Sequence, residues 1–189
     1  IKMVNYDILF AIVFYAILFL YYMTHKDKFE VQGKIFVMYK TQLGIKLMDK
    51  MAGFSPRLLN FLGGTGILVG FLGMFLIFYV LVQGTINLLT VENAVPVIAP
   101  VLPGVDVPGL PHLSFWHWII SILVVATIHE FSHGILARLH KIKVNSSGFA
   151  FLGPILAAFV EPDEKEMNES SRYKQLSVFA AGPWSNILT

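Results

Sequence analysis

The sequence predicts a mainly α-helical, polytopic membrane protein with about four transmembrane segments and a short, membrane-dipping β-hairpin. Apolar residues make up 56% of the 189 residues and charged residues only 14%, whereas globular domains carry roughly 25% charged residues. The charges gather in basic stretches that separate long runs without any charge. The net charge of +2 is too small to favour nucleic acid as a partner, and the absence of cysteine excludes disulfide scaffolds and Cys-ligated zinc.

Residues 1–24 are predicted to form the first transmembrane helix. Their apolar part, residues 8–23, is slightly short for a span, but Tyr21 and Tyr22 extend it with side chains that suit the membrane interface. A cleaved signal peptide is the alternative. Because charged residues follow and no small-residue cleavage site is found there, we favour a retained helix.

Residues 25–60 form a polar, basic stretch that we expect on the cytoplasmic side. Within it, residues 34–39 favour a β-strand. Four apolar residues that follow have helical spacing: Leu43, Leu47, Met48 and Met51. This pattern fits an interfacial helix on the membrane surface and a small packed cytoplasmic element equally well.

Residues 61–91 are predicted to form the second transmembrane helix, because no charged residue occurs between Leu58 and Val91. Gly66 and Gly70 have the spacing of a close-packing helix face. Residues 92–114 follow as an external loop that is rich in proline and glycine and contains neither lysine nor arginine. Proline at this density blocks a regular helix.

A third transmembrane helix is expected over residues 115–140, and it carries the pattern H-E-x-x-H at residues 129–133. Residues four apart lie on one helix face, so His129 and His133 can bind one Zn²⁺ ion. Glu130 can then accept a proton from a water that the metal activates. Ionisable groups inside a span indicate a functional site. The alternative is that the histidines are hydrogen-bonded interior residues and Glu130 packs against a buried partner.

Residues 141–174 are basic again, and short loops rich in lysine and arginine stay in the cytoplasm. This orientation places the H-E-x-x-H pattern in the cytoplasmic half of the bilayer, about 12 Å from the basic boundary. Gly153 and Pro154 indicate a turn between two short strands within residues 146–160. A hairpin at this depth could bind an extended substrate along its edge, and an ordinary interfacial loop is the alternative. Residues 175–189 begin a fourth transmembrane helix without a stop signal, so we interpret the chain as part of a longer protein.

Three elements together resemble the site-2 protease family of intramembrane zinc metalloproteases. They are the H-E-x-x-H pattern at 129–133, the stretch from Gly153-Pro154 to Glu161-Pro162-Asp163, and residues 181–186, which are similar to the family's A-G-P-x-x-N element. The resemblance covers about residues 115–189, and residues 1–114 match only in hydropathy.

The resemblance implies regulated intramembrane proteolysis: hydrolysis of peptide bonds within a transmembrane helix of a membrane protein substrate in the lipid bilayer. By position, His129 and His133 would bind one zinc ion per active site, and Glu130 would be the catalytic base. Gly153, Pro154 and Asn186 are candidate substrate-binding residues. Family members take a third metal ligand from an aspartate in a later L-D-G-type element, which we expect beyond Thr189.

Two other functions are weighed against this one. ZIP-type divalent-metal transporters also place a similar element in a span, but theirs resembles H-E-x-P-H, whereas position 132 is serine here. A non-catalytic membrane scaffold would bind no zinc. We therefore expect a multi-pass zinc metalloendopeptidase.

Overall fold

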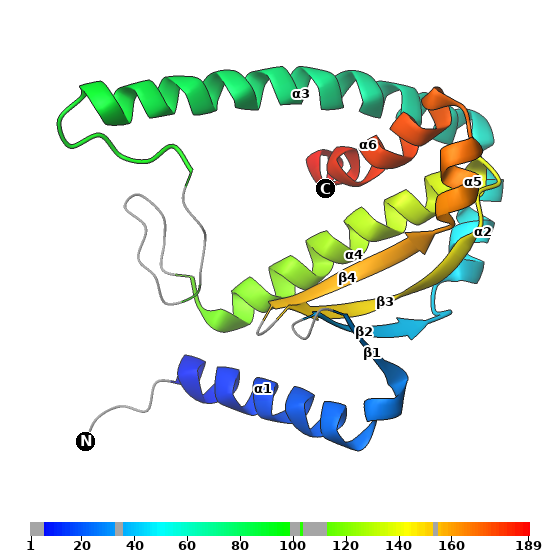
Figure 1. Cartoon of the computed structure of the whole chain (residues 1–189), viewed down its shortest axis with the longest axis horizontal. Coiled ribbons are helices and arrows are strands. Elements are labelled where there is room, and N and C mark those ends of the chain that lie inside the picture. Colours follow the sequence, from blue (N-terminus) through cyan, green and yellow to red (C-terminus); the bar gives the residue numbers. More distant parts are fainter. Residues whose placement is uncertain (1–5, 33–35, 99–102, 104–112, 153–154) are drawn as a thin grey trace.

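Helices and a four-stranded sheet make up the part of the chain that the computed structural model describes, which is residues 6–32, 36–98, 103, 113–152 and 155–189. In chain order the elements are α1 (Tyr6–Thr24), the 3₁₀ helix η1 (Lys26–Lys28), β1 (Phe29–Gln32), β2 (Phe36–Thr41), α2 (Ile45–Phe54), α3 (Pro56–Thr90), α4 (Phe115–Leu139), β3 (Val144–Leu152), β4 (Ile155–Pro162), α5 (Glu164–Glu169) and α6 (Arg172–Leu188). Figure 1 shows α6 between the long helices α3 and α4, with the sheet and α1 beyond α4.

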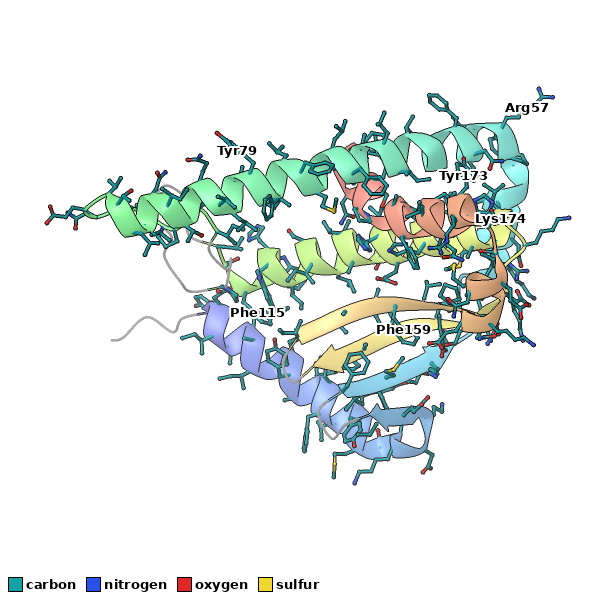
Figure 2. The ribbon with its side chains drawn as sticks, turned by 45° about the horizontal axis from the view of Figure 1, so that its top comes forward. Arg57, Tyr79, Phe115, Phe159, Tyr173 and Lys174 are labelled. Atoms are coloured by element: carbon teal, nitrogen blue, oxygen red, sulfur yellow. The ribbon has the colours of Figure 1, made fainter. Side chains whose placement is uncertain are left out.

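Helix α4 is the centre of this arrangement. It packs against α6 and β4, and it also contacts α1 and α2. A core of buried residues surrounds its C-terminal half: Met48, Ala52, Ile135, Leu136, Ala137, Ile142, Val144, Met167, Val178 and Ala181. Figure 2 shows the other end of α4, where Phe115 lies beside α1. There the backbone N–H of Phe115 donates to the carboxylate of Asp7 in α1 at 2.7 Å.

The sheet is antiparallel with the strand order β1-β2-β3-β4, so β4 forms one of its edges. The hairpin expected within residues 146–160 is present as β3 and β4, and its expected turn residues, Gly153 and Pro154, lie outside the described part of the chain. The strand expected at residues 34–39 corresponds to β2. Neither β1 nor the pairing of β2 with β3 was predicted from the sequence. Because β2 and β3 are far apart in the chain, no local sequence pattern indicates that they pair.

Three of the described helices, α1, α3 and α4, are long and apolar enough to cross a membrane. Many of their apolar side chains face outward, and Tyr79, on α3, is 61% exposed and points away from the fold in Figure 2. Helix α3 begins at Pro56, earlier than the expected residue 61, because proline suits the first helical position. Helix α6 covers the expected fourth segment with 17 residues, and a fourth span there stays a prediction.

Glycines bring α3 close to α6, as the sequence indicated. A methyl group built on Gly66 would lie 3.1 Å from the Trp184 ring, and one on Gly70 would lie 4.0 Å from the Ala180 Cβ. Small residues therefore allow the two backbones to approach closely.

The helix expected near residues 43–51 is present as α2. Its inner face contributes Met48, which is 1% exposed, and Ala52, which is 7% exposed, to the core beside α4. On its outer face, Leu47 is 52% exposed and Met51 is 44% exposed. A contact of that outer face with a membrane surface stays a prediction.

Candidate metal centre

The H-E-x-x-H residues lie on α4 just before its best buried turn. The helix begins after Ser114, whose hydroxyl accepts a hydrogen bond from the backbone N–H of His117, and it continues unbroken to Leu139. The spacing of four residues therefore puts both imidazoles on one face, with ring centroids 4.8 Å apart. One donor atom from each of His129, Glu130 and His133 lies within 4.8 Å of the others, and all three side chains are half-buried.

A carbonyl of the neighbouring helix holds the ring of His133. Its Nδ1 donates a hydrogen bond to the backbone oxygen of Val178 in α6, over 2.6 Å. A carbonyl oxygen can only accept, so the proton of the neutral ring is on Nδ1 and the lone pair is on Nε2. Nε2 is therefore the atom that His133 offers to a metal ion, and the bond to Val178 sets both the tautomer and the ring orientation.

A side chain of α6 holds the second ring. The amide nitrogen of Asn186 lies 2.9 Å from Nδ1 of His129. In this orientation the amide donates and Nδ1 accepts. Half a turn of the amide group would bring its oxygen to the ring, and Nδ1 would then donate and leave Nε2 available to a metal ion, as in His133. Asn186 was expected among the substrate-binding residues, and the structure places it against the ring of His129.

The edge strand of the sheet holds Glu130. The backbone N–H of Val160 in β4 donates to Oε2 of Glu130 at 3.1 Å. A cavity of about 200 Å³ reaches the same carboxylate between α4, α2 and the sheet, with Thr41, Thr127 and Ser147 in its wall. A water molecule takes up about 30 Å³ in the liquid, so the cavity has room for several. The carboxylate is thus both fixed in place and accessible to water.

Two imidazoles on one helix face and an adjacent carboxylate fit zinc, which prefers nitrogen and oxygen ligands of this kind. His129 and His133 would hold the ion. Within the described ranges, no further histidine, aspartate or glutamate joins this group. The third protein ligand expected beyond Thr189 therefore stays a prediction.

His140, seven residues beyond His133, lies outside the metal group. Its Nε2 lies 2.7 Å from the hydroxyl of Ser177, which is fully buried in α6, and its ring meets Tyr173 edge to face. Burial, and to a lesser extent the charge of Lys174, lower the pKa of His140 below its ordinary value of 6.5. Figure 2 shows Tyr173 and Lys174 at the start of α6. His140 therefore joins α4 to α6 as a neutral side chain.

Two groups of this site were not found by sequence reasoning, namely the carbonyl of Val178 and the N–H of Val160. Both are backbone atoms of ordinary apolar residues, so nothing in the residue types marks them. Gly153 and Pro154, expected to bind substrate, lie outside the described residues. Their role stays a prediction.

These features define a class: an integral membrane protein with a half-buried His-Glu-His group of the kind that holds a metal ion in metalloproteases. Comparison with known families agrees with this class. Residues 117–189 match the family model of peptidase family M50, the site-2 protease family. The resemblance seen in the sequence is thereby confirmed.

Among curated proteins, the chain is similar to the uncharacterized protein MJ0971 of Methanocaldococcus jannaschii. The two are 31% identical over 186 residues, which cover 94% of this chain and 47% of the relative. The chain thus spans about half the length of this relative. No solved structure matches the chain.

Proposed function

We propose that this chain carries the catalytic helix of an intramembrane zinc metalloendopeptidase that cleaves transmembrane segments of substrate proteins. The match of residues 117–189 to peptidase family M50 supports a protease, and M50 proteases use zinc. In this proposal the protein crosses the membrane several times and its active site lies in the cytoplasmic half of the bilayer. The basic stretches on either side of the apolar helices support that orientation.

The observation that carries the proposal is that α6 contacts both imidazoles at Nδ1. Both Nδ1 atoms have a partner from that helix, Val178 for His133 and Asn186 for His129. An interior histidine needs partners at both nitrogens to be satisfied. With the amide oxygen of Asn186 turned toward His129, the bonds leave both Nε2 atoms directed to one place beside Glu130, which is what a shared metal ion requires.

When bound, zinc supplies Lewis-acid chemistry, since it lowers the pKa of water and polarises a carbonyl group. Glu130 acts as the general base and accepts the proton of the attacking water. The same carboxylate then delivers this proton to the leaving amine. The hydrogen bond from Val160 keeps one carboxylate oxygen in place during both transfers.

The edge of β4 is suited to hold an unwound substrate stretch. A helical peptide has its carbonyl groups bonded and shielded, so a transmembrane helix must unwind locally before it is cut. The N–H of Val160 points to Glu130 rather than to β3, so this part of β4 turns backbone groups toward the active site. An extended peptide could pair with such an edge through main-chain hydrogen bonds.

Cleavage of a single-span model substrate by the full-length protein, in detergent with zinc, tests the proposal. The variant Glu130→Gln keeps the shape of the side chain but cannot accept a proton. Glu164→Gln, on the exposed start of α5, is the matched control. We expect cleavage by the wild type and the control, and zinc without cleavage in Glu130→Gln. Equal cleavage by all three would indicate a contaminating protease. Zinc uptake into vesicles without cleavage would favour a transporter, and absence of bound zinc would favour a scaffold.

A further inference from the structure

Gly182 of α6 stands directly over the two imidazoles of the candidate metal centre. A methyl group built on Gly182 would lie 2.5 Å from both Cδ2 and Nε2 of His129, and it would also contact Nε2 of His133 at an even shorter distance. Contacts below 3.0 Å are essentially never seen for real Cβ atoms. The missing methyl group therefore lets the backbone of α6 lie directly against both imidazoles.

The two rings must keep their places if they are to share a metal ion. Zinc–nitrogen bonds to histidine are about 2.0–2.1 Å long, so an ion bound to both Nε2 atoms must lie close to each of them. A methyl group on Gly182 would push the rings or α6 aside and disturb this arrangement. A glycine leaves the rings in place.

The backbone itself gives no reason for glycine at this position. Gly182 lies within α6, and its φ is outside the left-handed range that favours glycine. Glycine inside a helix is disfavoured relative to alanine, because it loses more conformational freedom on folding. The absence of a side chain is thus explained by the contact with α4 rather than by the conformation of α6.

Gly182 is also part of a stripe that faces the metal group along α6. Residues 178, 182 and 186 are four apart and so lie on one face of the helix. The carbonyl of Val178 binds His133, the amide of Asn186 binds His129, and Gly182 faces both rings between them. Val178 and Asn186 each contact one ring, and Gly182 between them lets α6 approach both rings closely.

We propose that Gly182 is a positioning residue: its missing side chain lets α6 pack against His129 and His133, so that the two rings keep the arrangement in which they can share one zinc ion. This inference rests on the proposed function, because it assumes that the two histidines bind zinc. It assigns a role to a residue with no functional group. It also explains in physical terms why a glycine stands within the A-G-P-x-x-N element of this chain.

Zinc binding by full-length Gly182→Ala in detergent tests the proposal directly. Gly73→Ala is the matched control, because a methyl group on Gly73 of α3 would meet nothing within 4 Å. Loss of a group that orients a ligand typically weakens metal binding about 10–100-fold, and a methyl group that displaces both ligand rings should weaken it at least as much. We therefore expect zinc affinity, measured by competition with a chelator, to fall by at least about 10-fold in Gly182→Ala and to stay at the wild-type value in Gly73→Ala. Wild-type zinc affinity in Gly182→Ala would overturn the proposal.

A second experiment needs no metal and covers the case in which the variant folds poorly. Gly182→Ala is compared in the zinc-free wild-type background and in the zinc-free double variant His129→Ala/His133→Ala, with thermal unfolding as the readout. We expect the added methyl group to lower the unfolding temperature where the imidazoles are present and to leave it unchanged or raise it where they are absent. An equal decrease in both backgrounds would overturn the proposal.

The two experiments also separate this inference from the proposed function. A wild-type protein that binds no zinc would contradict the proposed function, while the zinc-free comparison still reports whether Gly182 and the imidazoles share one space. A wild-type protein that binds zinc and cleaves its substrate, with a Gly182→Ala variant that does the same, would contradict only the role of Gly182.

Discussion

His133 and Val178 are joined by a hydrogen bond of 2.6 Å between the Nδ1 atom of the imidazole and the backbone oxygen of the valine. The bond connects the H-E-x-x-H helix α4 to α6, although the two residues are 45 positions apart in the chain. Asn186 makes the corresponding contact with His129. The candidate metal centre is therefore built between two helices, and the position of α6 decides whether both rings present Nε2 to the same place.

Removal of the Asn186 amide should weaken zinc binding. In Asn186→Ala the Nδ1 atom of His129 loses its partner at 2.9 Å, so the ring loses its fixed tautomer and orientation. Comparable losses around metal sites weaken affinity about 10–100-fold. Competition with a chelating dye measures the affinity, and Ser185→Ala is the neighbouring control, because the Ser185 hydroxyl bonds to a carbonyl of its own helix. Equal affinities in the two variants would mean that Asn186 does not support the ring.

Zinc should stabilise the folded protein through His129 and His133. A ligand that binds only the folded state adds about 2.7 kcal/mol to the free energy of unfolding at a concentration 100 times its dissociation constant. We expect the unfolding temperature of the wild type to fall after chelation and to recover when zinc is returned. In His129→Ala/His133→Ala, chelator and zinc should both be without effect. A zinc response that persists in this double variant would place the metal elsewhere.

Met48 should be far more important for stability than its neighbour Met51. The side chain of Met48 is 1% exposed and packs in the core next to α4, whereas Met51 is 44% exposed on the same helix. Truncation of a buried methionine to alanine costs about 2–5 kcal/mol of folding free energy, while surface substitutions usually change it by about 0.5 kcal/mol or less. Thermal unfolding of Met48→Ala and Met51→Ala in the same detergent measures the difference. Similar midpoints would show that α2 is not docked on α4 as described.

His140 should make the stability of the protein fall in mild acid. Burial and the charge of Lys174 lower its pKa in the folded state, so the unfolded chain takes up a proton at higher pH than the folded chain does. The stabilising effect of the neutral ring is complete above the unfolded pKa of about 6.5 and is lost as the pH falls toward the lower folded value. We expect the unfolding temperature to drop less between about pH 7 and about pH 5 in His140→Gln than in the wild type. If the difference in unfolding temperature between the two proteins stayed the same over this pH range, the lowered pKa of His140 would be contradicted.

Several elements could be predicted from the sequence because neighbouring residues alone determine them. Charge-free runs predicted α1, α3 and α4, since only the residues themselves decide whether a helix is apolar along its length. The strands of the hairpin were visible as short apolar runs on either side of Gly153 and Pro154. The four-residue spacing of His129 and His133 was enough to place two imidazoles on one face of a helix.

Contacts between distant segments could not be predicted in the same way. The pairing of β2 with β3 joins residues more than 100 positions apart, and only the folded chain brings Val160 of β4 against Glu130. The carbonyl of Val178 acts through its backbone, which every residue shares. The role of Gly182 could not be predicted either, because the effect of a missing side chain depends on which side chains the fold places around it.

The sequence by itself thus determined the apolar helices, the hairpin strands, the identity of the three chemical groups at 129, 130 and 133, and the match of residues 117–189 to a protease family. The tertiary structure alone decided which nitrogen His133 offers, what holds Glu130, and how closely α6 approaches the two rings. The physical reason is that residue type and spacing specify chemistry and helix faces, whereas tautomer, orientation and empty volume depend on atoms that another segment places nearby.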